Sequence, residues 1–142
     1  MRSRHAGVAV ALAAALVLTA CGGSGTGSTD GSPTPSARPS SPAQITILTP
    51  KEGAVVTGPS VRVRVNLTGA TIVPATTKNI TPTTGHLHLS LDGKLISMNY
   101  QATQTLPNVS PGTHVLKVEF VAADHLPFDP RVIQAVTFEV KS

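Results

Sequence analysis

The chain has 142 residues, with eleven Lys and Arg against seven Asp and Glu, a single cysteine and no tryptophan. The formal net charge is +4, and it falls to about +2 when residues 1–20, which include Arg2 and Arg4, are set aside. A nucleic-acid surface gathers Lys and Arg on one face with aromatic residues between them, whereas the positive residues here are scattered along the chain. We therefore predict no nucleic-acid partner.

Residues 1–20 have the pattern of a secretory signal peptide, because Arg2 and Arg4 precede an apolar run over residues 6–18. This run is shorter than the about 20 apolar residues of a transmembrane helix. It ends in LTACG, which contains Cys21, the one cysteine of the chain. LTACG resembles the lipobox of bacterial, in particular actinobacterial, lipoproteins. The resemblance implies cleavage before Cys21 and a diacylglyceryl group on its thiol. The alternative is an ordinary secreted protein with a chance cysteine.

A lipidated Cys21 would anchor the mature protein to the outer face of the cell membrane, since two or more acyl chains hold a protein there stably. The segment that follows, residues 22–43, consists almost wholly of Gly, Ser, Thr and Pro. Such a segment has too few apolar residues to offset the entropy of ordering. We expect residues 21–43 to be the lipidated cysteine and a disordered linker, which is either a plain spacer or a carrier of Ser/Thr glycosylation.

Residues 44–142 are predicted to form one β-domain, because about a hundred residues are enough for a single core. Apolar residues alternate with polar ones in five segments, and turn clusters such as Asp92-Gly93 and Ser110-Pro111-Gly112 separate them. The five segments are QITIL, VRVRVNL, HLHLSLD, HVLKVEF and AVTFEV. No window has a helical period. The fold class is therefore all-β, as a sandwich or a barrel.

Two stretches resemble strands of known bacterial modules. ITILTPKEGAVVTGPSVRVRVNLTG is similar to the first two strands, and LPNVSPGTHVLKVEFVAADHLPF to the sixth strand, of immunoglobulin-like and fibronectin-type domains. The resemblance implies an immunoglobulin-like antiparallel β-sandwich of about seven strands over residues 44–142. It further implies that the third strand, from Gly85, and the sixth strand, from Thr113, are antiparallel neighbours. The start of the third strand then lies beside the end of the sixth.

The segment GHLHLSLDG, residues 85–93, places three leucines on one face of a strand and His86 and His88 on the opposite, outer face. It resembles a Gly-His-x-His strand of exported bacterial proteins, a likeness that implies no activity. The topology implied above brings these two histidines beside residues 122–130, a loop that contains Asp124 and His125.

Four side chains are therefore candidates for a metal site: His86, His88, His125 and Asp124. Neutral imidazoles suit zinc and copper, and a carboxylate can complete the coordination. Met98 would add a soft ligand that favours Cu(I), although its spacing from the histidines differs from that of periplasmic copper chaperones. Two alternatives remain for His86 and His88: they face solvent as ordinary strand residues, or they contact a protein or glycan. The sequence assigns no cofactor, and zinc and copper are the candidates.

We expect a structural role for His114, because it alternates with core residues and follows a Pro-Gly-Thr turn, where related domains often place a tyrosine that bonds back to the preceding loop. We predict no enzyme, since the chain has no Gly-x-Ser-x-Gly elbow, no phosphate-binding Gly-Lys loop and no His-Glu-x-x-His. The leading hypothesis is a non-enzymatic binding or accessory module of the cell envelope. Its unknown partner, a protein or a glycan, would contact the loop end formed by residues 69–88 and 122–131. The alternative hypothesis is zinc or copper binding.

Overall fold

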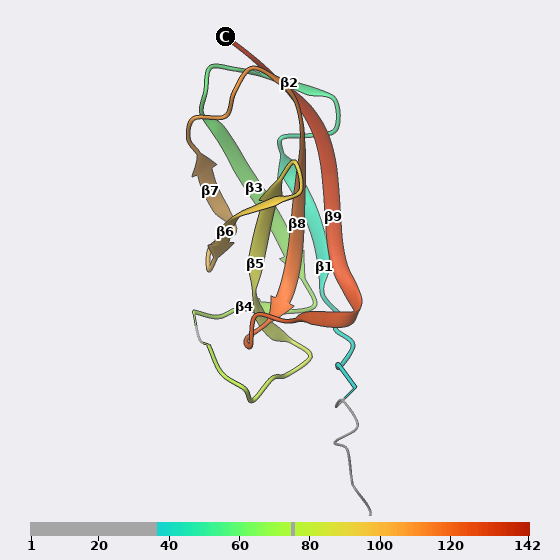
Figure 1. Cartoon of the computed structure of the whole chain (residues 1–142). Helices are drawn as coiled ribbons and strands as arrows, with labels where there is room; N and C mark the ends of the chain where they lie inside the picture. The colour runs from blue at the N-terminus through green and yellow to red at the C-terminus, as the bar shows by residue number, and fades with distance from the viewer. Residues whose placement is uncertain (1–36, 75) are drawn as a thin grey trace, which may run out of the picture. The chain divides into compact units, whose positions relative to one another are not determined.

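The computed structural model describes residues 37–74 and 76–142 (Figure 1). The predicted signal peptide, Cys21 and most of the predicted linker lie outside the described residues. The described residues contain nine β-strands. No segment of this described part forms a helix that could span a bilayer.

The strands form two sheets. The smaller sheet has the order β1-β3-β7 and consists of β1 (Gln44–Thr49), β3 (Val61–Thr68) and β7 (Thr103–Leu106). The larger sheet has the order β2-β9-β8-β5-β4, and β6 pairs with β5 as well. Its strands are β2 (Ala54–Thr57), β4 (Thr71–Ile72), β5 (Thr84–Leu91), β6 (Lys94–Asn99), β8 (Gly112–Ala122) and β9 (Pro127–Lys141). Only two of these pairings are parallel, β2 with β9 and β4 with β5.

The all-β sandwich is confirmed, but the described residues hold nine strands where we expected about seven. The two additional strands are β2 and β4, which have four and two residues. Segments this short are too brief to show a period of two, so their apolar pattern does not reveal them. They precede β5, and for this reason the predicted third and sixth strands are β5 and β8 in the structure.

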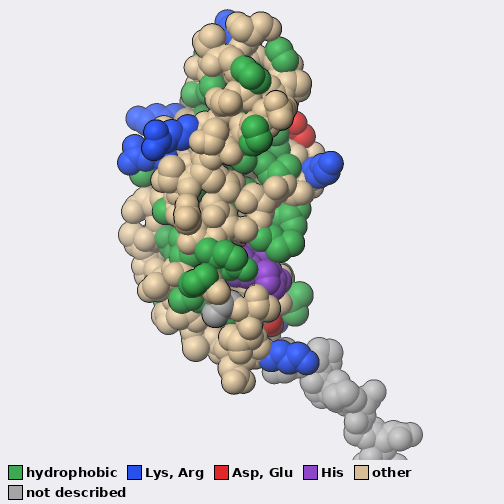
Figure 2. Space-filling model, turned by 90° about the vertical axis from the view of Figure 1, so that its left-hand side faces the viewer, with side chains coloured by type: hydrophobic (Ala, Val, Ile, Leu, Met, Phe, Trp, Pro, Cys, Tyr) green, Lys and Arg blue, Asp and Glu red, His purple; other side chains and the backbone are tan. Residues whose placement is uncertain are grey.

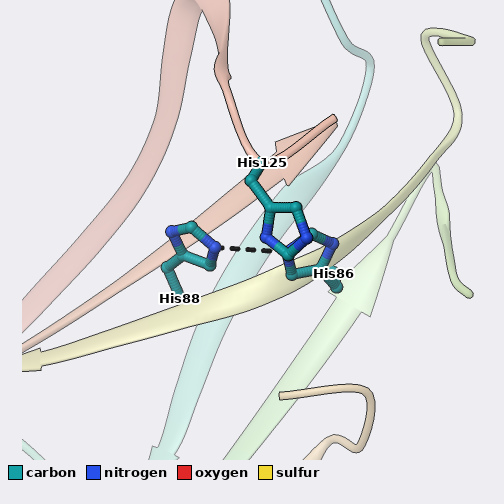
Figure 3. A group of neighbouring side chains, drawn as sticks. All are labelled: His86, His88 and His125. Carbon is teal, nitrogen blue, oxygen red and sulfur yellow. Dashed lines mark hydrogen bonds between the residues drawn. The ribbon is translucent and has the colours of Figure 1, made fainter. Parts of the chain in front are cut away.

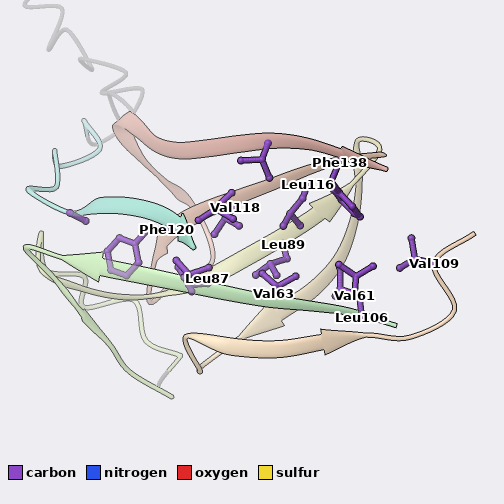
Figure 4. Packing of buried hydrophobic residues seen from close by; sticks show 14 of the residues in the cluster. Val61, Val63, Leu87, Leu89, Leu106, Val109, Leu116, Val118, Phe120 and Phe138 are labelled. Atoms are coloured by element: carbon purple, nitrogen blue, oxygen red, sulfur yellow. The ribbon is translucent and has the colours of Figure 1, made fainter. Parts of the chain in front are cut away.

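The core lies between the two sheets, where the alternation of each strand directs its apolar side chains (Figure 4). In β3, every second residue from Val61 to Val65 is buried and the residues between are exposed. Phe120 of β8 and Phe128 of β9 stack with their ring centroids 5.6 Å apart. Leucines and valines of β3, β5 and β8 fill the centre of the core: Val61, Val63, Val65, Leu87, Leu89, Leu116 and Val118.

Strands β5 and β8 are antiparallel neighbours, as the immunoglobulin-type topology implied. Gly85 pairs with Ala122 at one end of this ladder and Leu91 pairs with Leu116 at the other. The first residues of β5 therefore lie beside the last residues of β8 and the turn that follows them, which is the arrangement that the histidine hypothesis requires.

The last residues of the predicted disordered linker make defined contacts with the sandwich. Ala43 is buried in the core, the Ser41 hydroxyl donates a hydrogen bond to the carbonyl of Pro82, and Arg38 binds the turn after β8. Strand β1 does begin at Gln44. The expectation of disorder is nevertheless wrong for Arg38–Ala43, because these residues contact the sandwich. The Gly/Ser/Thr/Pro-rich composition of the whole segment gave no sign of these contacts.

Candidate functional site

Three histidines converge at the end of the sandwich where β5 begins and β8 ends (Figure 3). Nε2 of His86 lies 3.1 Å from Nε2 of His88 and 2.9 Å from Nδ1 of His125. One nitrogen from each of the three rings lies within 4.8 Å of the other two. The ring planes are inclined to one another by 32° to 65°. We call His86, His88 and His125 the histidine cluster.

The backbone positions each imidazole by local rules. The period of two in β5 places His86 and His88 on one face, and the tight turn between β8 and β9 brings His125 over that face. His125 has a φ of 66°, a left-handed conformation that residues other than glycine seldom adopt. Backbone hydrogen bonds close this turn, from the His125 N–H to the Ala122 carbonyl at 3.0 Å and from the Ala122 N–H to the Leu126 carbonyl at 3.1 Å.

The face of β5 that carries the histidine cluster is largely covered. His86 is 0% exposed, and the Tyr100 ring lies with its centroid 5.2 Å from that of His86. In the β4–β5 loop, Oγ1 of Thr76 lies 3.2 Å from Nε2 of His125. The interpretation of His86 as an ordinary solvent-facing residue is therefore wrong. Figure 2 shows that histidine side chains still reach the surface, next to hydrophobic ones.

The environment keeps the imidazoles of β5 neutral at neutral pH. Burial, followed by the neighbouring His125 and His88, lowers the pKa of His86 to about 4. Burial and then His125 also lower the pKa of His88, while Glu119 acts in the opposite direction. Neutral imidazoles have free lone pairs, which is the form that binds metal ions.

The hydrogen bonding of His86 is incomplete without a further atom. Its Nε2 meets nitrogens of two other rings although it carries at most one proton, so only one of the two contacts can be a hydrogen bond. Its buried Nδ1 meets no hydrogen-bond partner among the described residues, and an ion on Nε2 would leave that nitrogen as it is. A metal ion would accept all three converging lone pairs. Tetrahedral Zn–N bonds of 2.0–2.1 Å place ligand nitrogens about 3.3 Å apart. The two separations from Nε2 of His86 are a few tenths of an ångström shorter, and the nitrogens of His88 and His125 lie within 4.8 Å of each other. The three rings therefore fit a transition metal once side-chain rotation brings His88 and His125 to the same spacing.

Asp124, the carboxylate among the predicted ligands, does not belong to the converging group of ligand atoms. Its Oδ2 lies 2.6 Å from Nη1 of Arg38, and its Oδ1 accepts hydrogen bonds from Nη2 of Arg38 at 3.0 Å and from the Leu126 N–H at 3.1 Å. The hydrogen bond from Arg38 is the main cause of the lowered pKa of Asp124. Asp124 thus stabilises the turn that carries His125. Both of its carboxylate oxygens accept hydrogen bonds from the described residues Arg38 and Leu126 and do not point to the histidine nitrogens as ligands.

Several neighbours of the histidine cluster were not predicted from the sequence. Thr76 and Tyr100 carry no motif that singles them out, and their contacts depend on the course of two loops. Glu119, directly opposite His88 on β8, is 4% exposed and binds Arg131 through both carboxylate oxygens, at 2.7 and 2.6 Å. Met98, named from the sequence as a possible soft ligand, is the cross-strand partner of His88, as expected from the tight hairpin that the Asp92-Gly93 turn indicates.

His114 lies at the opposite end of β8, where the sequence placed it. Its Nδ1 is 2.7 Å from Oδ2 of Asp92, and its Nε2 is 2.8 Å from the carbonyl oxygen of Ser110 in the preceding loop. The backbone N–H of Val115 donates to Oδ1 of the same Asp92. His114 therefore has the predicted structural role of bonding back to its own turn, and it has no part in the histidine cluster.

This pair makes stability depend on pH. The hydrogen bond to Asp92 raises the pKa of His114 above its ordinary 6.5, and the same bond lowers the pKa of Asp92 below its ordinary 3.8. The His114 contribution is complete below pH 6.5 and is lost as the pH rises through the raised value. The Asp92 contribution is complete above pH 3.8 and is lost as the pH falls through the lowered value. The pair stabilises most between these two limits.

We predict that Asp92→Asn lowers the unfolding free energy by about 1 kcal/mol or less at pH 5, since the Asp92 side chain is 51% exposed and solvent screens the pair. Asparagine tolerates the φ of 51° at this position and keeps one oxygen for the Val115 N–H, but its amide NH2 cannot accept from Nδ1–H of His114, so the charge and this hydrogen bond are lost together. Urea denaturation of both proteins from pH 4 to 9 measures the difference, which should shrink above pH 7. A difference that grows with pH would contradict the assignment.

An open groove of about 600 Å³ lies on another part of the domain and includes Lys51, Arg62 and Arg64 in its lining. Three positive residues that look scattered in the sequence are thus gathered by the pairing of β1 with β3. Within residues 37–74 and 76–142, no histidine and no aromatic residue lines this groove. The absence of a nucleic-acid partner stays a prediction.

The fold is shared with solved structures. Fibronectin(III)-like modules of CbhA from Clostridium thermocellum are 20% identical, with a TM-score of 0.51 over 69% of this chain and 96% of that chain. An endo-β-1,4-mannanase from Thermotoga petrophila is 14% identical, with a TM-score of 0.45 over 70% of this chain and 20% of that chain. The PKD domain of human KIAA0319 is 17% identical, with a TM-score of 0.43 over 87% of this chain and 92% of that chain. No protein-family model and no curated protein matches the sequence. The CbhA modules support the predicted fibronectin-like sandwich, and at this identity they support the fold alone.

Proposed function

We propose that this domain binds a transition-metal ion through Nε2 of His86, Nε2 of His88 and Nδ1 of His125. The observation that carries the proposal is the convergence of three imidazole nitrogens, at 2.9 and 3.1 Å, around a side chain that is 0% exposed. The three residues come from two segments that are far apart in the sequence. A solvated pair of strand histidines would need neither this burial nor the third ring.

The neighbouring groups suit this role. When Nδ1 of His125 binds the ion, its Nε2–H is free to donate to Oγ1 of Thr76, 3.2 Å away. Such an outer hydrogen bond sets the tautomer and orientation of a metal-ligating histidine. Three neutral imidazoles suit zinc and copper among the common ions.

We place this metal site in a non-enzymatic accessory module of the cell envelope. The lipobox-like LTACG supports anchoring of Cys21 to the outer face of the membrane, and the fibronectin-like sandwich is compatible with a binding module. The proposed working surface is the loop end formed by residues 69–88 and 122–131, which also carries the histidine cluster. An envelope protein or glycan would therefore contact the domain beside the metal.

Zinc or copper is expected to stabilise the protein, tested on the chain from residue 21 with Cys21→Ser to prevent lipidation. At a free metal concentration of 100 times Kd, the gain is about 2.7 kcal/mol, or a rise of roughly 10 °C in Tm for a domain of this size. A chelator should reverse the rise. Differential scanning calorimetry and isothermal titration with Zn²⁺ and Cu²⁺ provide the measurements.

The matched variants are His88→Ala, which removes one half-buried ligand, and His114→Gln, which removes a histidine outside the cluster. His88→Ala should abolish the metal-dependent rise in Tm, and His114→Gln should keep it from a lower starting Tm. Metal binding weaker than about 10 µM in the wild-type protein, or unchanged binding in His88→Ala, would refute the site. A module that only binds an envelope partner predicts no thermal response to metal.

A further inference from the structure

Met98 lies in the sheet directly beside the histidine cluster. It is the cross-strand partner of His88 in the β5–β6 ladder. Directly opposed residues point to the same face of a sheet, with their Cβ atoms about 4.5–5.5 Å apart. The Met98 side chain is unbranched and flexible, and at 52% exposure it has room to turn toward the cluster without disturbing the core.

One border of the cluster is formed by apolar side chains. Tyr100 follows two residues after Met98 and packs on the His86 ring, and Leu126, next to His125, is 53% exposed. Figure 2 shows hydrophobic side chains at the surface beside the histidines. We call Met98, Tyr100 and Leu126 the apolar rim.

Two carboxylates beside the cluster, Glu119 opposite His88 and Asp124 before His125, are engaged elsewhere. Both oxygens of Glu119 bind Arg131, and both oxygens of Asp124 accept from Arg38. Within the described part of the chain, a fourth ligand is therefore easier to obtain as a thioether than as a carboxylate.

Resting on the proposed function above, we propose that Sδ of Met98 is the fourth ligand and that the site selects copper as Cu(I). The ligand set is then three neutral imidazole nitrogens and one thioether sulfur. Soft thioether ligands select Cu(I), whereas oxygen ligands suit harder ions. A singly charged ion also costs less than a divalent one to place among neutral ligands beside an apolar rim.

Met98→Leu tests the inference, because leucine keeps the apolar volume and removes the sulfur. Cu(I) affinity is measured without oxygen at pH 7 by competition with bicinchoninate, starting from the acetonitrile complex of Cu(I), and Zn²⁺ affinity by titration. We expect Met98→Leu to weaken Cu(I) binding about 10- to 100-fold and to leave Zn²⁺ binding within about twofold. X-ray absorption at the copper edge should show a Cu–S distance in the wild-type protein alone. Ile96→Leu, on the same strand, is the matched control and should change neither affinity.

Unchanged Cu(I) affinity in Met98→Leu with no copper–sulfur scattering would overturn this inference, while loss of binding in His88→Ala would still support the metal site. An equal loss of Cu(I) and Zn²⁺ binding in Met98→Leu would also overturn it, since the thioether would then confer no selectivity. If the wild-type protein binds neither ion, the proposed function fails and the inference fails with it.

Discussion

Gly85→Ala is expected to lower the free energy of unfolding by about 3 kcal/mol. A Cβ atom on Gly85 would lie 2.0 Å from the carbonyl oxygen of Val121 and 2.9 Å from Cζ of Phe120. The first contact is with the backbone of the paired strand, so no side-chain rotation relieves it. β5 has to move away from β8 at the point where their ladder begins. Thermal and urea denaturation measure the loss.

The same variant should impair the site, because His86 directly follows Gly85 and His125 lies in the turn that follows the partner strand. Movement of β5 changes the separation of 2.9 Å between their nitrogens, so Zn²⁺ affinity should fall even where the fold persists. Thr83→Ala, at an exposed position two residues earlier, is the control and should stay within about 0.5 kcal/mol of wild type. A Gly85→Ala protein as stable as this control would refute the close approach of the two strands.

Arg38→Met is expected to cost about 2 kcal/mol of stability and to weaken metal binding about tenfold. The guanidinium donates from Nε to the Pro127 carbonyl at 2.8 Å, from Nη2 to the Leu126 carbonyl at 3.0 Å, and to both oxygens of Asp124. The side chains of Arg38 and Asp124 are only 26% and 18% exposed, so water replaces these bonds incompletely. His125 lies between Asp124 and Leu126 in the turn, so in Arg38→Met it loses the hydrogen bonds that hold the residues on both sides of it.

The cost of Arg38→Met should depend on pH in a defined direction. The Arg38 hydrogen bond lowers the pKa of Asp124 below its ordinary 3.8, so the stabilisation is present above that pH and is lost as the pH falls through the lowered value. The difference between wild type and Arg38→Met is therefore largest near pH 7 and shrinks toward pH 3. A double-mutant cycle with Asp124→Asn isolates the pair. Additive effects in that cycle, with unchanged Zn²⁺ affinity in Arg38→Met, would contradict the proposed role.

Much of the fold was predictable because strand burial is a local property. Alternation in residues 61–67 and 86–91 follows from which face of each strand contacts the core, and the turn residues Asp92-Gly93 end β5 where the structure ends it. β2 and β4 escaped prediction because they are too short to show a period. Arg38 and Ala43 escaped it because their contacts with residues far along the chain leave no trace in a Gly/Ser/Thr/Pro-rich composition.

The candidate site was predictable to a smaller degree. The period of two places His86 and His88 on one face, and the topology implied by the family resemblance brings His125 beside them. Neither argument could indicate that Asp124 is bound by a residue 86 positions away. Neither indicated that Tyr100 and His125 cover His86.

By itself, the amino-acid sequence determined the all-β class, the common face of His86 and His88, and the turn that holds His114, because each depends on residues close together in the chain. The tertiary structure alone decided that His86 is fully buried, that Arg38 forms an ion pair with Asp124, and that three imidazole nitrogens converge. These features depend on which distant segments meet, and the hydrogen bonds and burial that such meetings create have no periodic signature in the sequence.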